Sequence, residues 1–549
     1  MATTREENAL EKEAGTRPVR HETGHRASVR FGEPELRAWV DGLLNRHPAI
    51  GLAVGIVRDG SVELVDHRGF ADTASKTPID ADTVFRIGSV TKPFTAVAVM
   101  QLHEQGLIDL DAPANDYLRA YQLIPAHAGL RPPTVRHLLT HTAGIAEVQR
   151  VRDLFHPEAG PFDSRPPILS VSAGAPMPSL AEYYRRGLRV VAQPGTRFAY
   201  SNPGFATLGQ IVEDVSGVAL ERWFRVRIFE PLGMADTDLV RSDRVASRLA
   251  TGYALGRHGV KAVPDRDWIG AGSGGIYSTV RDLARFAAAL LGRGTNEHGS
   301  ILEPATLATM FEPHDQPDPR VPGWGLGFAR DDVGGHRVVG HDGILPGFNS
   351  TLLVAPDDGL AIVALTNGSK GAFVWMETES ERLLRQLLDA PDEGIRTDIP
   401  HHPEVWDELC GRYRLPPRIA DLRGRLALAG GVQVFVRGGR LMIRAPVPLP
   451  AIHRGLPMHP DDEHDPHVFR LDLSGLGLGT VRVVFGRDVA SDTGAIHARL
   501  GGQPISLVRK PATGRARGPL TGAVGGPLVA AAARSVRQRR QRSTEVGPQ

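Results

Sequence analysis

The stretch ADTVFRIGSVTKPFTAVAVMQLHEQG, residues 81–106, decides the fold. Apolar residues recur with helical spacing from Ser89 to Gln105, and Gly106 ends the pattern. The spacing therefore predicts a helix over 89–105, preceded by the mainly apolar segment Phe85-Arg86-Ile87-Gly88. Side chains three positions apart on a helix are neighbours, so Ser89 and Lys92 are expected to lie on one face of the first turn.

This Ser-x-x-Lys pair is a candidate for nucleophilic catalysis. A serine hydroxyl needs a base beside it, and a lysine can be that base when burial or a nearby cation lowers its pKa. The free N–H groups of a helix N-terminus would also favour developing negative charge. An N-capping serine followed by a surface lysine gives the same pattern. However, the chain has only six lysines, and none of the other five follows a serine at this spacing.

Two later segments add residues with suitable chemistry. Tyr200-Ser201-Asn202 offers a phenol that can act as an acid or a base and an amide that can hold a substrate or orient a lysine. Gly340-His341-Asp342-Gly343, at the end of a predicted strand, offers glycines that let a substrate backbone approach closely. Each segment taken alone also fits an ordinary turn or hairpin.

Together, and in this order, the three segments resemble the signature of the serine β-lactamase and penicillin-binding-protein superfamily. The Y-x-N and H-x-G forms are similar to those of the class C β-lactamase branch, which includes family VIII carboxylesterases and D-aminopeptidases. Three flanking segments also resemble that branch: Thr134–Gly144, Ser273–Leu283 and Gly325–Phe328. The resemblance extends over roughly residues 33–390 and implies an acyl-enzyme mechanism.

The resemblance also implies roles for individual residues. Ser89 would be the acylated nucleophile, and Lys92 would take its proton or hold the phenolate of Tyr200. Tyr200 would protonate the leaving group and then activate water. Whether Lys92 or Tyr200 is the acylation base stays open. Asn202 would bind a substrate carbonyl and hydrogen-bond to Lys92.

The third segment would complete the substrate side of the site. The backbone N–H groups of Ser89 and Ile344 would form the oxyanion hole, with His341 and Gly343 beside it. β-Lactamases normally have Lys-Thr-Gly here, and that lysine helps to bind the β-lactam carboxylate. A neutral His341 next to Asp342 therefore predicts weak or no β-lactamase activity. The chemistry needs no cofactor and no metal.

The function expected from the sequence is a serine hydrolase acting on a small ester or amide, of the carboxylesterase or D-amino-acid peptidase type. Alternatives are an acyltransferase on the same fold and a catalytically silent ligand-binding relative. An α/β-hydrolase is disfavoured because residues 271–275 lack the first glycine of G-x-S-x-G. A metal site is disfavoured because its candidate ligands lie in a Pro- and Asp-rich loop: His453, His459, Asp461, Asp462, His464, Asp465 and His467.

The 549 residues are too many for a single core. We expect an α+β fold with an antiparallel sheet flanked by helices and a helical subdomain, followed by a small C-terminal all-β domain. The expected division is a disordered tail over 1–30, a hydrolase domain over 31–390, a linker over 391–403, a β-sandwich or barrel over 404–510 and a basic disordered tail over 511–549.

Composition narrows the possible partners. The net charge of +2 is no sign of nucleic-acid binding, although the segment from Lys510 to Gln549 carries +7. The single cysteine, Cys410, excludes an intramolecular disulfide.

Residues 1–30 contain no apolar run of signal-peptide length, and the sequence has no transmembrane segment, so a cytoplasmic protein is expected. The expected partner is a small-molecule ester or amide, or a peptide, and the sequence leaves the oligomeric state open.

Overall fold

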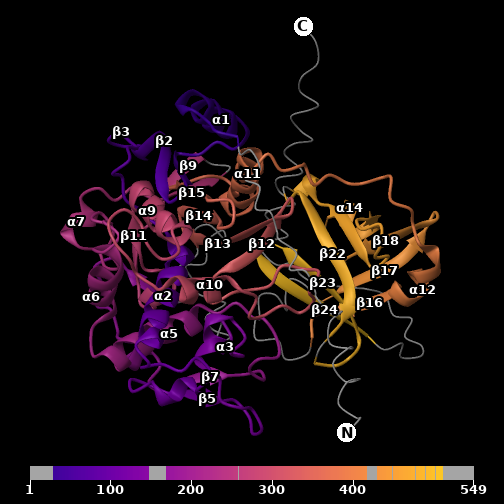
Figure 1. The fold of residues 1–549 in the computed structure, drawn as a ribbon, viewed down its shortest axis with the longest axis horizontal. Helices are drawn as coiled ribbons and strands as arrows, with labels where there is room; N and C mark the ends of the chain where they lie inside the picture. The colour runs from indigo at the N-terminus through magenta and orange to yellow at the C-terminus, as the bar shows by residue number, and fades with distance from the viewer. Residues whose placement is uncertain are drawn as a thin grey trace, which may run out of the picture.

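The computed structural model describes residues 29–147, 169–256, 259–416, 430–447, 449–476, 478–488, 490–500 and 502–510. Figure 1 shows a larger helix-and-sheet unit beside a smaller unit of strands. No helix in these ranges is long and apolar enough to cross a membrane. The expected tails over 1–30 and 511–549 lie almost entirely outside the described residues.

The larger unit is built on a seven-stranded sheet with the order β12-β13-β14-β15-β1-β2-β3 and antiparallel pairing between neighbours. Its two halves come from opposite ends of the unit, as the sequence order of strands and helices predicted. The strands are β1 (Gly51–Arg58), β2 (Ser61–Asp72), β3 (Thr77–Pro78), β12 (Ala329–Val333), β13 (His336–Leu345), β14 (Phe348–Ala355) and β15 (Leu360–Thr366).

Both faces of the sheet are covered, and every residue of the central strands β1 and β15 is buried. On one face, the sheet packs against a core that includes α2 (Thr91–Glu104), α5 (Asn202–Ser216) and α9 (Val280–Leu291). On the other face, α1 (Glu33–Arg46) and α11 (Ala372–Leu387) pack in a separate cluster. Continuous apolar runs rather than alternation mark such doubly covered strands.

Short helices and strands connect these layers. The remaining helices are η1 (Gly88–Val90), η2 (Ala114–Asp116), α3 (Val135–Leu139), α4 (Leu180–Tyr183), α6 (Leu220–Phe224), the π-helical η5 (Arg225–Phe229), α7 (Asp243–Ala246), α8 (Ala271–Gly274) and α10 (Pro304–Phe311). The remaining strands are β4 (Phe85–Arg86), β5 (Leu123–Pro125), β6 (Ser170–Ser172), β7 (Leu188–Val190), β8 (Tyr253–Gly256), β9 (Gly259–Ala262), β10 (Arg266–Trp268) and β11 (Tyr277–Ser278).

The smaller unit is a nine-stranded antiparallel sheet that curls around its own apolar core. Its order is β19-β18-β17-β16-β24-β23-β22-β21-β20. The strands are β16 (Gly411–Arg414), β17 (Val432–Arg437), β18 (Arg440–Arg444), β19 (Leu456–Pro457), β20 (His459–Pro460), β21 (Val468–Asp472), β22 (Thr480–Arg487), β23 (Gly494–Leu500) and β24 (Gln503–Arg509), with η6 (Pro403–Val405), α12 (Trp406–Leu409), α14 (Pro450–Arg454) and η7 (Ser474–Leu476). The predicted α+β fold followed by a small all-β domain is confirmed.

The helix predicted over 89–105 forms as η1 followed by α2, and all of α2 except its last two residues is buried. Its burial explains why so many apolar residues surround the Ser-x-x-Lys pair. One placement was wrong: His341 and Gly343 lie inside β13 rather than after its end, because β13 continues to pair with β14 as far as Leu345.

Gly343 is required where β13 crosses the segment before Ser89. A Cβ at Gly343 would lie 2.0 Å from the carbonyl oxygen of Ile87 and 2.2 Å from Ser350 Oγ. We expect Gly343→Ala to lower the free energy of unfolding by about 1–3 kcal/mol, since overpacking forces the backbone to move. Chemical denaturation would measure this change. Gly42→Ala in α1, whose Cβ would have ordinary contacts, is the control, and an equal effect of both substitutions would contradict this account.

Candidate active site

Ser89 and Lys92 lie at the junction of η1 and α2, with Ser89 part-exposed and Lys92 fully buried. Lys92 Nζ lies 2.9 Å from Ser89 Oγ, 2.7 Å from Asn202 Oδ1 and 2.7 Å from the carbonyl oxygen of Ser273. The structure thus brings together the predicted serine, lysine and asparagine from α2, α5 and the α8 segment.

Burial changes the acid–base behaviour of Lys92. Desolvation lowers its pKa to about 7, and the negative charge of Glu147 partly opposes this shift. Asn202 Oδ1 and the Ser273 carbonyl can only accept hydrogen bonds. A neutral Lys92 amine that donates its two protons to these acceptors must direct its lone pair toward Ser89. The geometry therefore prepares Lys92 to accept the proton of the Ser89 hydroxyl.

Glu147 fixes the orientation of Asn202, and sequence reasoning missed it. The backbone N–H and Nδ2 of Asn202 donate to the two carboxylate oxygens of Glu147, at 2.6 and 2.7 Å. Because Nδ2 is held by this carboxylate, Oδ1 faces Lys92. The sequence offers one signal for Glu147: it is the only acidic residue in segment 140–147. The other residues of that segment are uncharged except for His141, which can titrate.

Tyr200 lies just before α5, and its ring closes one side of the site. Lys92 Nζ lies 4.8 Å from the centre of the Tyr200 ring, a distance within cation–π range. The His141 ring packs against Tyr200 with 4.3 Å between ring centres. His141 Nδ1 accepts the backbone N–H of Ser201 at 3.1 Å, and burial holds the pKa of His141 well below its usual value. His141 thus packs as a neutral ring that supports Tyr200.

His341 approaches the same group from β13. Its ring centre lies 6.1 Å from that of Tyr200, and its Nδ1 lies 2.7 Å from the carbonyl oxygen of Asp342. Burial and the nearby Lys92 lower the pKa of His341 to about 3, so the ring is neutral at physiological pH. The third motif therefore contributes no positive charge.

The backbone of β13 lies close to η1, the short helix that contains Ser89. A Cβ at Gly88, where φ is +52°, would be 3.1 Å from the backbone nitrogen of Ile344. Ser350 Oγ donates to the carbonyl oxygen of Ile87 at 2.6 Å and ties this segment to β14. The predicted oxyanion donors, the N–H groups of Ser89 and Ile344, are thus on adjoining backbone segments.

Other candidate residues lie elsewhere. Ser273, in the segment considered for an α/β-hydrolase, is fully buried and its hydroxyl donates to the carbonyl oxygen of Gly270. His467, from the loop considered for a metal site, pairs with Glu408 at 2.7 Å. Within the described residues, no group of three or more His, Cys, Asp or Glu side chains is arranged to hold a metal ion.

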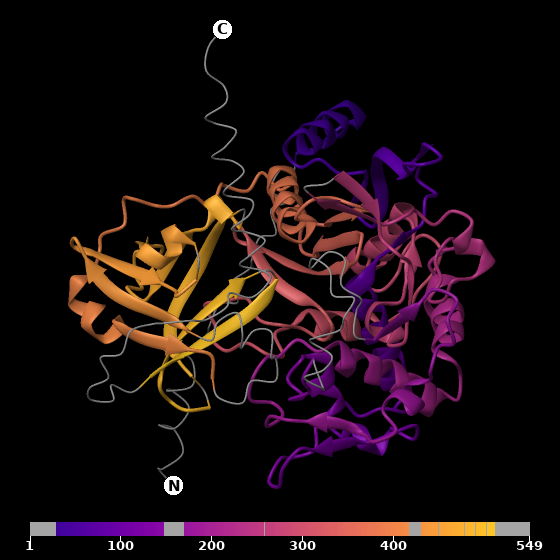
Figure 2. The same cartoon turned by 180° about the vertical axis from the view of Figure 1, so that it is seen from behind.

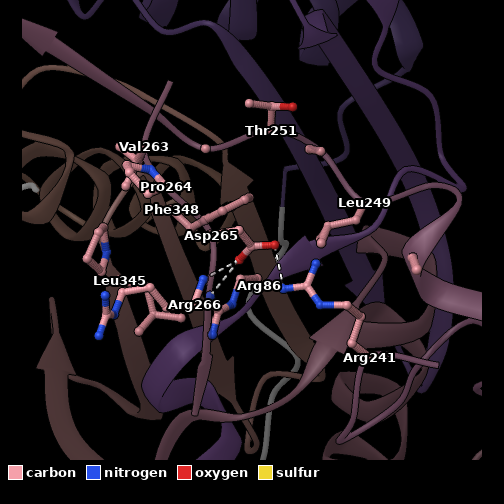
Figure 3. Close-up of a pocket in the computed structure, with 14 residues that line it drawn as sticks. Arg86, Arg241, Leu249, Thr251, Val263, Pro264, Asp265, Arg266, Leu345 and Phe348 are labelled. Atoms are coloured by element: carbon pink, nitrogen blue, oxygen red, sulfur yellow. Dashed lines mark hydrogen bonds and ion pairs between the residues drawn. The ribbon is translucent and has the colours of Figure 1, made fainter. Parts of the chain in front are cut away.

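A cavity of about 230 Å³ lies beyond the end of β13 (Figure 3). Apolar side chains on its walls include Leu249, Val263 and Phe348, and Leu345 directly follows Ile344. Arg86, three residues before Ser89, also lines it and pairs with Asp265 at 3.0 Å. The cavity therefore has an apolar wall and an ion pair, Arg86–Asp265, close in sequence to Ser89.

A helix-and-sheet domain with a buried Ser-x-x-Lys pair at the start of a core helix defines a class of serine hydrolase folds, and comparison with known proteins identifies the family. The chain belongs to the Beta-lactamase family, whose sequence profile matches residues 36–385. It is 31% identical over 407 residues to penicillin-binding protein 4 of Amycolatopsis lactamdurans, across 71% of this chain and 96% of that protein.

Two further proteins extend the comparison. A D-aminopeptidase of Cereibacter sphaeroides is 26% identical over 451 residues, across 75% of this chain and 79% of that protein. The octameric penicillin-binding protein homologue from Pyrococcus abyssi has a TM-score of 0.55 at 23% identity, and the match covers 87% of this chain and 99% of that chain. The predicted superfamily and its β-lactamase/transpeptidase-like fold are confirmed. The family and the named relatives indicate a hydrolase.

The orientation of Asn202 yields a test. Glu147→Gln replaces one acceptor with an NH₂ group that cannot accept from Asn202, and it removes the charge that raises the pKa of Lys92. We expect kcat/KM for p-nitrophenyl acetate to fall about tenfold, in line with the loss of a buried charged hydrogen bond. The acid limb of its pH profile should move to lower pH, because Lys92 then loses its proton more easily.

The exposed Glu230→Gln serves as the charge-matched control and should leave both the rate and the profile unchanged. A profile of Glu147→Gln that keeps the wild-type midpoint would show that Glu147 does not act on Lys92.

Proposed function

We propose that the protein is a serine hydrolase that forms an acyl-enzyme at Ser89 with a small neutral ester or amide. The observation that carries this proposal is the 2.9 Å contact between Ser89 Oγ and a fully buried lysine. A lysine with a pKa of about 7 can accept a proton near neutral pH, which an exposed lysine cannot do.

In acylation, Ser89 Oγ attacks the substrate carbonyl carbon while its proton passes to Lys92, directly or through Tyr200. The carbonyl oxygen takes the negative charge and accepts the N–H groups of Ser89 and Ile344. Collapse breaks the bond to the alcohol or amine, which leaves with a proton from Tyr200. Water then attacks the ester carbonyl carbon on Ser89 and loses a proton to Tyr200. Collapse breaks the bond to Ser89 Oγ, which takes back the proton held by Lys92, and the acid is released.

The third motif favours substrates without a carboxylate at that position. His341 stands where β-lactamases have the lysine and is neutral, and Asp342 beside it is an acid. The cavity beyond β13 offers the apolar wall of Leu345 and Phe348 to an acyl group or a side chain. A carboxylic ester, or an amide with a D-residue, therefore fits better than a β-lactam.

The nucleophile is tested with a fluorophosphonate probe and intact-mass analysis. Wild type should gain one adduct and hydrolyse p-nitrophenyl acetate and butyrate, whereas Ser89→Ala should do neither. Ser247→Ala, at an exposed position at the end of α7, is the matched control and should label like wild type. Neither adduct nor turnover in wild type would refute the hydrolase proposal.

The role of Tyr200 is tested with leaving groups of different basicity. An amide nitrogen must be protonated as it leaves, whereas p-nitrophenolate departs without a proton. Tyr200→Phe should therefore reduce the hydrolysis of D-alanine p-nitroanilide by about 10²–10⁴-fold, the usual contribution of a general acid. Acylation by p-nitrophenyl acetate, followed by stopped flow, should fall much less. Equal losses with both substrates would contradict a proton-donor role.

A further inference from the structure

A cluster of half-buried charges lies behind the third motif, and the C-terminal domain supplies its cation. Arg499, in β23, places Nη1 2.6 Å from Asp331 Oδ2 and 3.4 Å from Glu381 Oε1, and Nη2 2.9 Å from Glu377 Oε1. The acids belong to β12 and α11 of the hydrolase unit. Figures 1 and 2 both show the C-terminal strands beside β12.

Asp342 connects this cluster to the catalytic strand. Its Oδ1 accepts from Thr351 Oγ1 at 2.8 Å, which leaves Oδ2 toward the C-terminal domain. A Cβ at Gly502 would lie 3.4 Å from Asp342 Oδ2 and 3.3 Å from Glu377 Oε1. The backbone after β23 therefore covers both carboxylates, and Asp342 is the middle residue of the motif that also carries His341.

Among the described residues, the four acids have no other cation in this cluster than Arg499. Burial and the charge of neighbouring carboxylates raise the pKa of Asp342, Glu377 and Glu381. Glu377 and Glu381 are four residues apart on α11, a spacing that sets like charges against each other. Burial and the neighbouring Glu377 raise the pKa of Asp342 to about 7, while Arg499 acts in the opposite direction. Removing Arg499 from this half-buried cluster takes the cation from several acids at once, which is more costly than breaking a single, more exposed pair.

We propose that Arg499 is a positioning residue through which the C-terminal domain completes the hydrolase site. By neutralising carboxylates on β12, β13 and α11, it holds β13 against the segment that contains Ser89 and keeps the Ile344 N–H in place. The effect of Arg499 on catalysis rests on the proposed function, whereas its effect on the position of β13 does not.

A second ion pair between the two units provides the comparison. Arg320, in the hydrolase unit, pairs with Asp465 of the C-terminal domain at 2.7 Å, and both side chains are about 30% exposed. Among the described residues, the hydrogen bonds and ion pairs of Arg320 and Asp465 do not reach β13. Asp465→Asn thus removes a contact between the units without disturbing the carboxylate cluster.

The first experiment measures hydrogen exchange in the full chain and requires no activity. Arg499→Met should speed the exchange of amides in peptides from β12 and β13, residues 329–345, while Asp465→Asn leaves them unchanged. Glu381→Gln added to Arg499→Met removes one repelling charge and should restore much of the protection. Unchanged exchange in Arg499→Met, or equal exchange in both single variants, would overturn the proposal.

The second experiment measures fluorophosphonate acylation of Ser89 and ester turnover in the same variants. Arg499→Met should lower kcat by about 10–100-fold, the range expected from a displacement of about 1 Å, with little change in KM. The double variant should recover several-fold, and Arg499→Lys, which keeps the charge, should lose less than Arg499→Met. A KM effect alone, or no recovery in the double variant, would contradict a positioning role.

The two proposals fail in different ways. Wild type that neither labels nor turns over ester refutes the hydrolase proposal, and the exchange pattern still decides the role of Arg499. Wild type that labels, with Arg499→Met labelling at the same rate, refutes the role of Arg499 alone.

Discussion

The arrangement of the candidate site depends on one buried amine. Lys92 is fully buried and has three polar neighbours, two of which are carbonyl oxygens with no proton to give. Burial disfavours the ammonium form, and the two carbonyls determine where the protons of the neutral amine point. The remaining lone pair faces Ser89. In the proposed mechanism, the Ser89 hydroxyl thus meets an amine whose pKa burial has lowered to about 7.

The rest of the structure holds the partners of this amine in place. The core beneath the sheet buries α2, while Glu147 orients the Asn202 amide from one side and the Ser273 carbonyl closes the other. Strand β13 brings Ile344 close to Gly88, and this contact requires glycine at 343. The C-terminal domain reaches β12, the neighbour of β13 in the sheet, through the ion pair of Arg499 with Asp331, so a distant part of the chain packs close to the third motif.

Much of this was predictable because the informative residues are local. The helix after Ser89 followed from apolar spacing, and the order of three short motifs was sufficient to indicate the superfamily. Glu147 and Arg499 were not predictable in the same way. Each acts through a tertiary contact. Glu147 contacts Asn202, 55 residues later in the chain, and Arg499 contacts Asp331, 168 residues earlier. The sequence does not show which residue a charged side chain contacts, so no local pattern marked Glu147 or Arg499. The placement of His341 inside β13 depended on pairing with β14, which periodicity alone does not reveal.

The protonation of Lys92 is the most direct test of this account. The chain has only six lysines, so ¹³C labelling at the lysine Cε position gives few NMR signals, and Lys92→Met identifies the one that belongs to the site. The account predicts that this signal titrates with a midpoint of about 7, well below the ordinary lysine value. A Lys92 signal that titrates near 10.5 together with the others would show that the amine stays charged at neutral pH and cannot serve as the base.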